Sequence, residues 1–533
     1  MKYIELFAGC GGLSLGLESV GFELLFANEL SPMASETYAF NLLHEDLSAP
    51  DITKAKKVLW ITSNFTKKEI AKRLRENPQT FPKYDKGRSD LSTDPENLDG
   101  CLLVGSIIEL NRFLEQNVAV AERIRKQNID LVSGGPPCQS FSLAGLRQVD
   151  NQRNSLPMDF AKFVSLTKPK VALLENVSGI LRAFKVNGGK YFAWYEVARA
   201  FASVEYYPVC LHVNAKNVGA AQNRPRFILL ALRKDVFGAI QNQVEDSEVA
   251  HIFAQTQHFF DKEKSGAQTI PFQDLGYLDI EKNRSTFLKD PFSSLLRIES
   301  EKDFYSVEDA IDDLNEYSRS SSKYASMLID AFPNKTYTHD VKTIANHEKR
   351  GNSDKVKMRF MLYQHLSDLK LKSSSEPLQG VEKNVIQFLQ DPEGSALSDS
   401  SITFLLKRKF LSKDGRSLIE FSSAEALLDY LKHLSTKKQT QRALLRSSPA
   451  PASLSIPDDA CHYDKRLQRT LTVREMARFQ SFPDWFQFRS KVTTGGKMRR
   501  FEVPQYTQVG NAVPPLLGRA LGETVKAVLR LAE

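Results

Sequence analysis

One cysteine in a loop rich in glycine and proline is the side chain of this sequence best suited to do chemistry. Residues 134–142 read GGPPCQSFS and follow the apolar run at 129–133, so Cys138 comes just after an expected strand. Glycine permits unusual backbone angles and proline fixes φ, so this loop would hold its cysteine at a defined point. A lone cysteine is otherwise a small buried hydrophobe. The residue types therefore leave two alternatives for Cys138, a core position or a covalent nucleophile.

A glycine turn near the start of the chain is typical of a nucleotide-binding unit. The pattern predicts a strand at 3–8, a turn at 9–12, a helix at 13–20 and a second strand at 22–30, which ends near Glu29. In such a unit the turn lets the backbone approach the ligand, and the carboxylate accepts hydrogen bonds from ribose hydroxyls. Because the glycines read GCGG and not GxGxxG, the pyrophosphate fingerprint is absent. A nucleoside without phosphates fits better.

Further strands predict an α/β fold. They are expected at 101–104, 129–133, 171–174 and 226–232, with helical stretches between them. This alternation is typical of a mainly parallel sheet with helices on both faces, whose ligands lie at the carboxyl ends of the strands. The groups expected along that edge are the turn at 9–12, Glu29, Ser106, the Pro-Pro-Cys loop and Glu175.

Length and charge add two expectations. A chain of 533 residues exceeds what one hydrophobic core usually supports. The polar segment at 44–100 is expected to be an insertion. The net charge of +8 suits a polyanionic partner. Residues 401–446 contain ten Lys or Arg and four Asp or Glu, so they hold much of this surplus. Phosphate contacts and a merely solvated helical face both account for such a run.

Cysteine usage and hydropathy indicate where the protein works. The five cysteines are odd in number and never form a C-x-x-C pair, which indicates neither a disulfide framework nor a zinc site. No apolar run reaches the length of a membrane helix, and no basic leader precedes one. We expect a cytoplasmic protein that binds no metal and no membrane.

Six sequence blocks together resemble one enzyme family. They are ELFAGCGGLSLGLESVGF at 5–22, GGPPCQSFS at 134–142, LLENVSGI at 173–180, QNRPRFILL at 222–230, LTVREMARFQSFPD at 471–484 and QVGNAVPPLL at 508–517. In this order they resemble the motifs of the cytosine-C5 DNA methyltransferases of the prokaryotic restriction-modification type. The resemblance implies a Rossmann-like S-adenosylmethionine-dependent methyltransferase sheet, with helices on both faces, and a smaller target-recognition domain.

The resemblance also implies roles for four residues. The Cys138 thiolate would add to C6 of cytosine and make C5 nucleophilic. Glu175 would hold the N3 and amino edge of the ring and act as an acid toward N3. Arg226 would contact the carbonyl at position 2, and Arg224 would support the cysteine loop. Residues 139–155 would close as a lid behind a base flipped out of the duplex.

S-adenosylmethionine is the co-substrate that the resemblance implies. Three residues of the first turn, the acid of the second strand and two residues of the last motif would contact it, with the last motif folded back beside the first. These residues are Phe7, Gly9, Gly11, Glu29, Asn511 and Val513.

Two positions depart from the family pattern. Ser106 stands where the family usually has an Asp that binds the adenine amino group. A hydroxyl can accept that hydrogen bond, but without the charge, which puts cofactor affinity or adenine selectivity in doubt. Ala221 stands where a proline is common, and we expect it to be tolerated.

The order of the blocks predicts the domains and the partners. Residues 1–234 would form the catalytic domain with its insertion at about 44–100, residues 235–488 the target-recognition domain including LTVRE, and residues 489–533 would return to the catalytic domain. Because the basic run at 401–446 falls inside the expected recognition domain, phosphate contacts are favoured for at least some of its charges. The expected partner is double-stranded DNA, bound by a monomer, with a separately acting restriction endonuclease. Residues 493–500 (TTGGKMRR) could be a hinge, a backbone clamp or a solvated loop.

Other functions remain open on sequence alone. A transfer RNA cytosine-C5 methyltransferase would share the architecture, although the long middle region argues against one. A catalytically silent DNA-binding homologue would share the scaffold, but Cys138, Glu175 and Arg226 are all present. A dinucleotide-dependent oxidoreductase is disfavoured by the missing fingerprint.

Overall fold

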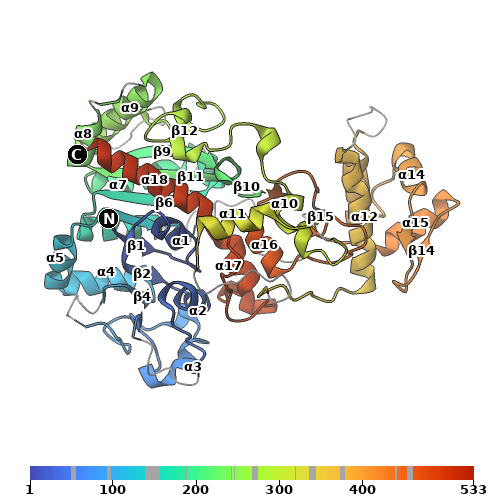
Figure 1. Cartoon of the computed structure of the whole chain (residues 1–533), viewed down its shortest axis with the longest axis horizontal. Coiled ribbons are helices and arrows are strands. Elements are labelled where there is room, and N and C mark those ends of the chain that lie inside the picture. Colours follow the sequence, from blue (N-terminus) through green and yellow to red (C-terminus); the bar gives the residue numbers. More distant parts are fainter. Residues whose placement is uncertain are drawn as a thin grey trace.

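A nine-stranded sheet lies at the centre of the molecule (Figure 1). The computed structural model describes residues 1–49, 56–92, 98–137, 156–186, 189–241, 243–244, 246–266, 274–318, 320–334, 344–371, 379–438, 441–452 and 460–533. The strand order is β12-β9-β11-β6-β5-β1-β2-β4-β3. The strands are β1 Lys2–Leu6, β2 Glu23–Glu29, β3 Val58–Trp60, β4 Cys101–Val104, β5 Leu131–Gly134, β6 Val171–Val177, β9 Tyr206–Asn214, β11 Pro225–Arg233 and β12 Leu278–Asp279.

The predicted mainly parallel sheet is confirmed, with one reversed strand. β11 runs antiparallel to both β6 and β9, whereas the other neighbouring strands pair in parallel. The carboxyl ends of β1, β2, β4, β5 and β6 therefore share one edge. Because β11 is reversed, its amino end, where the predicted arginines lie, reaches that same edge.

Helices cover both faces of the sheet, as predicted. Tyr3 of β1 donates a hydrogen bond to Glu18 of α1 (Gly12–Glu18), which lies on one face. Phe26 pairs in register with Ile4, the neighbour of Tyr3, and its ring contacts Phe163 of α6 (Leu156–Thr167). Since alternate residues of a strand point to opposite faces, α6 covers the face opposite α1. Helices α4 (Ile107–Gln116), α5 (Val118–Lys126) and α7 (Ala193–Ser203) pack beside α6.

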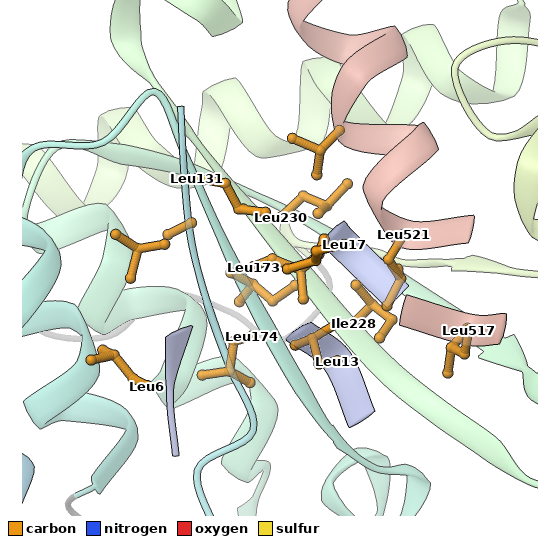
Figure 2. Packing of buried hydrophobic residues seen from close by; sticks show 14 of the residues in the cluster. Leu6, Leu13, Leu17, Leu131, Leu173, Leu174, Ile228, Leu230, Leu517 and Leu521 are labelled. Atoms are coloured by element: carbon orange, nitrogen blue, oxygen red, sulfur yellow. The ribbon is translucent and has the colours of Figure 1, made fainter. Parts of the chain in front are cut away.

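The end of the chain packs on its beginning. Helix α18 (Pro515–Leu531) lies against α1, and Figure 2 shows their leucines over the leucines of β5, β6 and β11. The two helices approach closely at Gly16, where a Cβ atom would lie 2.4 Å from the Arg519 nitrogen and 2.5 Å from the Pro515 oxygen. Only glycine fits such a backbone-to-backbone contact.

A second hydrophobic cluster lies apart from the sheet core. It is formed by buried residues between 358 and 461, whereas buried residues at 236–332 belong to the large cluster that contains the sheet. Figure 1 places the helices of the second cluster at the far end of the molecule from the sheet. They are α12 Asp354–Leu371, α13 Val381–Gln390, α14 Asp399–Leu406 and α15 Ala424–His433.

The remaining helices connect the sheet core and the second hydrophobic cluster, or flank the sheet. They are α2 Pro32–Tyr38, α3 Ile70–Arg73, α8 Lys234–Gln241, α9 Ser247–Lys264, α10 Val307–Ile311, α11 Lys323–Ala331, α16 Val473–Phe479 and α17 Gln505–Asn511. None of the described helices is long and apolar enough to cross a membrane.

The contact at Gly16 predicts a large cost for a single added methyl group. Gly16→Ala should destabilise the fold by about 1–3 kcal/mol, because the new Cβ meets backbone atoms that cannot rotate away. Urea denaturation followed by circular dichroism measures this change. Gly238→Ala in α8 is the matched control, since nothing lies within 4 Å of the Cβ it adds. The control should be neutral or slightly stabilising, and equal losses in both variants would contradict the close-contact argument.

Candidate active site

The first glycine turn and the acid of β2 are brought together. Phe7, Gly9 and Gly11 have φ angles of 54°, 57° and 95°, so the turn runs through left-handed backbone. The Gly9 nitrogen donates to Glu29 Oε2 at 2.8 Å, and the Ser31 nitrogen donates to Glu29 Oε1 at 2.7 Å. Burial raises the pKa of Glu29, and these backbone donors partly offset that effect. The carboxylate is thus held in a fixed orientation beside the turn.

The last motif lies against the same turn. At Gly12 a Cβ would lie only 2.3 Å from the Val513 oxygen, and the Cys10 thiol is 3.8 Å from the Gln508 oxygen. Asn511, at the end of α17, is exposed. The structure therefore places Asn511 and Val513 next to the first turn.

Ser106 lies at the same edge of the sheet. It follows β4, in which Val104 pairs with Glu29 of β2, and it is the N-cap residue of α4. Its hydroxyl accepts a hydrogen bond from the Ile108 nitrogen at 3.2 Å. The cap fixes the serine side chain two residues beyond the partner of Glu29.

A buried ion pair joins the two predicted catalytic side chains of the sheet. Glu175 of β6 and Arg226 of β11 are both buried, and Arg226 Nε lies 2.6 Å from Glu175 Oε1. Arg226 also donates to the Pro225 oxygen at 2.8 Å. Burial lowers the pKa of Arg226, and the nearby Glu175 acts in the opposite direction. The pair presents a carboxylate and a guanidinium together at the carboxyl edge of the sheet.

The start of the cysteine loop packs against this ion pair. A Cβ on Gly134 would lie 2.4 Å from the Leu6 oxygen, and one on Gly135 would lie 3.0 Å from Glu175 Oε2. Asn176 Nδ2 donates to the Pro136 oxygen at 3.0 Å. The two glycines thus allow the chain to pass between β1 and Glu175. Cys138 and the predicted lid at 139–155 lie outside the described residues.

Arg224 is buried beside the last motif. Its Nη2 donates to the Gly510 and Ala512 oxygens at 2.9 and 3.0 Å. Burial lowers its pKa well below the usual value, with a further contribution from Arg226. Its described contacts therefore tie the strand that carries Arg226 to the motif that carries Asn511.

The other four cysteines are poor nucleophiles. Cys10, Cys101, Cys210 and Cys461 are all buried, and burial raises the pKa of each thiol, that of Cys101 to about 11. A thiol reacts as its thiolate, which these sites disfavour.

A comparison with known families agrees with this geometry. The model of the C-5 cytosine-specific DNA methylases matches residues 1–70 and 112–527. The chain belongs to this family. The protein is therefore a cytosine-C5 DNA methyltransferase that depends on S-adenosylmethionine as its co-substrate.

Known relatives match this methylase over nearly its whole length. Type II methyltransferase M.DdeI of Desulfomicrobium norvegicum is 24% identical over 526 residues, covering 98% of this chain and 88% of the relative. Type II methyltransferase M.AgeI of Thalassovita gelatinovora is 25% identical over 555 residues, covering 99% and 100%. The solved S. pombe Dnmt2 methyltransferase has 13% identity and a TM-score of 0.37, covering 99% of this chain and 98% of its own.

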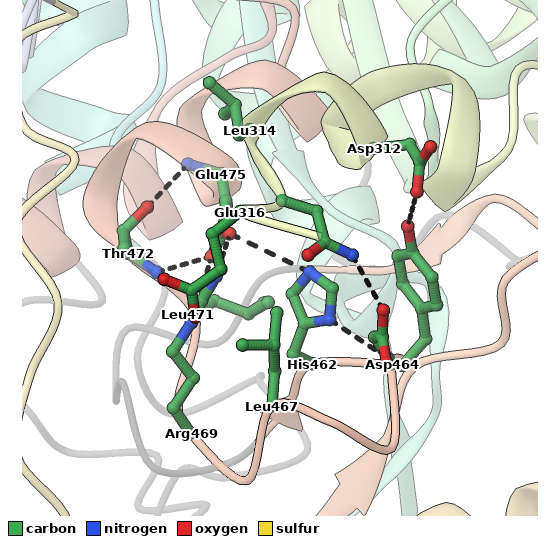
Figure 3. A network of polar contacts seen from close by, with 12 residues as sticks. Asp312, Leu314, Glu316, His462, Asp464, Leu467, Arg469, Leu471, Thr472 and Glu475 are labelled. Carbon is green, nitrogen blue, oxygen red and sulfur yellow. Dashed lines mark hydrogen bonds and ion pairs between the residues drawn. The ribbon is translucent and has the colours of Figure 1, made fainter. Parts of the chain in front are cut away.

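The LTVRE segment of the methylase forms a buried network of ion pairs. Arg469 binds Glu475 of α16 through two contacts at 2.7 and 2.8 Å, and the Thr472 nitrogen donates to the same carboxylate at 2.8 Å. Figure 3 shows this carboxylate facing His462. Arg478 pairs with Asp484 at 2.7 Å and with Asp313 at 2.5 Å. The network joins residues 312–316 and 460–470 to α16.

Sequence reasoning missed a second buried network beneath the first turn. Glu5 of β1 accepts a hydrogen bond from Ser14, which also lies 2.9 Å from the Tyr38 hydroxyl. Beside it, Tyr3 binds Glu18 at 3.0 Å. Burial raises the pKa of Glu5 to about 8 and that of Glu18 to about 7. The sequence feature that could have revealed this network is Glu5 itself, an acid inside an otherwise apolar strand, three residues before Ala8.

These two carboxyl groups predict a stability that falls with rising pH. Their pKa values in the folded methylase lie above the ordinary value of 4.5, so unfolding releases protons between about pH 5 and pH 8. The stability they contribute is complete below pH 4.5 and is lost as the pH rises through 7 and 8. The variant Glu5→Gln keeps a hydrogen-bonding side chain but cannot titrate. It should reduce this pH slope by about half, measured as the urea midpoint at each pH.

Glu23→Gln, at the exposed start of β2, is the control and should keep the wild-type slope. At acidic pH the contribution of Glu475 to the dependence of stability on pH has the opposite sign, because Arg469 holds the pKa of Glu475 at about 2 in spite of its burial. A slope that is unchanged in Glu5→Gln would contradict a buried, protonated Glu5.

Proposed function

We propose that this methylase modifies a cytosine that is flipped out of a specific duplex DNA sequence, with Cys138 as its covalent nucleophile. The observation that carries this proposal is the buried Glu175–Arg226 pair, which lies against the first residues of the cysteine loop. The four described cysteines are buried with raised pKa values, which leaves Cys138 as the candidate thiolate.

The proposed reaction begins with addition to the ring. The Cys138 thiolate forms a bond to C6 of cytosine, and the electron pair of the C5–C6 double bond moves toward N3. N3 takes a proton from the Glu175 carboxyl group, which must first have bound that proton from solvent, because in its ion pair with Arg226 it is a carboxylate. The product of this step is an enamine whose C5 is nucleophilic. Arg226 would bind the carbonyl oxygen at position 2 and hold the Glu175 carboxyl group in line with N3.

The second half restores the ring. When bound, S-adenosylmethionine supplies an electrophilic methyl group for C5. Loss of the C5 proton to solvent and return of the N3 proton to Glu175 then accompany cleavage of the bond between sulfur and C6. Cys138 leaves as a thiolate, so the protein ends in its starting state.

The first turn and the last motif would hold the co-substrate. Nothing lies within 4 Å of a Cβ built on Gly9, so its backbone borders open space beside the Glu29 carboxylate, which can accept from ribose hydroxyls. Phe7 and Gly11 shape the turn, and Asn511 and Val513 border it. Ser106 would accept from the adenine amino group through a hydroxyl that its cap role already orients.

Residues 354–467 are proposed as the unit that reads the DNA sequence. They contain the second hydrophobic cluster and lie inside the interval 235–488 that the sequence assigns to target recognition. The interval 139–155 is proposed as the lid, because a stacked base cannot present C6 to a thiol. The Type II relatives favour a role in restriction-modification, with the protein protecting cytoplasmic DNA from a separate endonuclease.

Methylated cytosines in a host genome test the reaction. In a bacterial strain without cytosine methylation of its own, expression of the protein should place 5-methylcytosine at one recurring sequence, read by bisulfite sequencing. Cys138→Ala should leave no methylated site. In vitro, labelled S-adenosylmethionine should transfer label to duplex DNA, and label in transfer RNA alone would replace the proposal by the RNA-directed alternative.

A trapped adduct tests the role of Cys138 directly. A duplex with 5-fluorocytosine at the methylated position should form an adduct that survives denaturing electrophoresis, because fluorine cannot leave as a proton does. Cys138→Ala should abolish the adduct, whereas Cys210→Ala, which removes a buried thiol of β9, should retain it. Glu175→Gln should lower kcat by about 10²- to 10⁴-fold, the usual range for loss of a proton donor. An adduct in Cys138→Ala would rule out this mechanism.

A further inference from the structure

Two short segments carry as much net charge as the entire chain. Residues 64–92 contain eight Lys or Arg and four Asp or Glu, and residues 489–502 contain five and one. Their combined net charge of +8 equals that of all 533 residues. The rest of the molecule is therefore neutral as a whole. We call these two segments the basic surface.

The two segments lie side by side although they are far apart in the sequence. Arg75 donates to the Ser490 hydroxyl at 3.3 Å, and Gln79 donates to the Arg500 oxygen at 3.4 Å. Figure 1 places α3, inside the first segment, beyond β4 at one end of the sheet. The two positively charged segments are thus neighbours there.

Most cations of the basic surface face solvent without an acidic partner. In the part of the chain that the structure describes, no carboxylate lies within 4.0 Å of the nitrogens of nine exposed side chains. These are Lys67, Lys68, Arg75, Lys83, Lys86, Arg88, Lys497, Arg499 and Arg500. A protein does not gather unpaired charges of one sign for its own stability, because they repel one another. A polyanionic partner would relieve that repulsion.

The predicted phosphate-binding run at 401–446 differs in this respect. Five of its cations lie near carboxylates, and three of these pairs are Arg408–Asp368, Lys409–Glu420 and Lys413–Asp429. Two others pair as Lys432–Glu393 and Arg446–Glu308. The charge counted from the sequence therefore overstates how many cations of this run are free to bind phosphates.

The structure also separates two of the three alternatives for residues 493–500, the hinge and the backbone clamp. Glu502 binds both Lys491 and Thr494, so the base of this loop is fastened on each side. The tip, with Lys497, Arg499 and Arg500, is exposed. A fastened base with a cationic tip fits a backbone clamp better than a hinge.

The position of the basic surface relates it to the active site. Residues 64–92 follow the carboxyl end of β3, which is parallel to β4, so they leave the sheet at the edge where Glu175 lies. β3 is five strand positions from β6, or about 24 Å at the usual strand spacing of about 4.8 Å. DNA rises about 3.4 Å per base pair, so this distance corresponds to about seven base pairs.

We propose that the basic surface binds phosphates of duplex DNA about seven base pairs from the target cytosine. This inference rests on the proposed function and adds a contact outside the recognition unit. Its partner is the phosphodiester backbone of flanking DNA of any sequence, because flexible lysines and arginines recognise charge and not base edges. Residues 71–92 lie outside the part of the chain that the family model matches, whereas residues 64–70 and 489–502 lie inside it, so only part of the basic surface belongs to this chain's own insertion.

Salt-dependent binding tests this surface. The probe is a fluorescein-labelled 40-base-pair duplex of arbitrary sequence, and its affinity is measured by anisotropy over a range of NaCl concentrations. The triple variant Lys497→Ala, Arg499→Ala, Arg500→Ala should bind about tenfold more weakly. The slope of log affinity against log salt should become shallower by about 2 to 3, since each phosphate contact contributes about 0.9. The triple variant Lys67→Ala, Lys68→Ala, Arg75→Ala should show the same weaker binding and shallower slope.

The matched control is the triple variant Lys57→Ala, Lys126→Ala, Lys234→Ala. These exposed lysines directly precede β3, end α5 and follow β11, at the opposite edge of the sheet, and the net charge changes by the same amount. The control should keep the wild-type slope. Equal slopes in all of the variants and the wild type would overturn the proposal, and so would equal losses in the control.

Flank length distinguishes this inference from the proposed function. With the methylated sequence known, kcat/KM of the wild type should rise when the duplex extends beyond about seven base pairs on one side of the target. The basic-surface variants should lose this gain while methylating short duplexes as the wild type does. A wild type that methylates DNA but ignores flank length would reject the basic surface alone. A wild type that methylates no DNA would reject the proposed function instead.

Discussion

The close contact between the two ends of the chain is the constraint on which the site depends. α1 and α18 approach through Gly16, and the Val513 oxygen lies where a side chain of residue 12 would be. Backbone groups in such contact cannot shift independently, so the first turn and the last motif are positioned as one unit. Arg224 extends this unit to β11 through the Gly510 and Ala512 oxygens. The first turn, the last motif and the start of β11 are thereby held by one frame.

A reversed strand makes the Glu175–Arg226 pair possible. In a wholly parallel sheet the amino end of β11 would lie at the opposite edge from Glu175. Because β11 is antiparallel to β6, Arg226 enters at the same edge and reaches Glu175 across one strand spacing. The pair is buried, where an unpartnered charge of either sign would be costly. Each side chain therefore keeps the other at the edge of the sheet.

Hydrophobic patterns predicted the strands that carry the site, and missed features that depend on distant partners. The strand at 101–104 matches β4, and those at 129–133 and 226–232 differ from β5 and β11 by one or two residues. Hydrophobic patterns did not predict β9, whose aromatic residues and Pro208 obscure the alternation, or β3, which has three residues in a polar stretch. Glu29 and Gly9 were expected at one edge because strand ends converge. The Glu5 network and the pairing of the 401–446 cations needed contacts between elements that no local pattern records.

The return of the last helix also bears on how the protein is made. Since α18 packs on α1, and the last motif borders the turn at residues 9–12, this turn stays without its final partner during synthesis until α18 has emerged from the ribosome. The recognition unit, with its own hydrophobic cluster, is complete well before that moment. A chain whose first turn has its final partner has therefore already made the residues of the second hydrophobic cluster. Translation that stops before α18 leaves a product in which the turn at residues 9–12 lacks the backbone that packs against it.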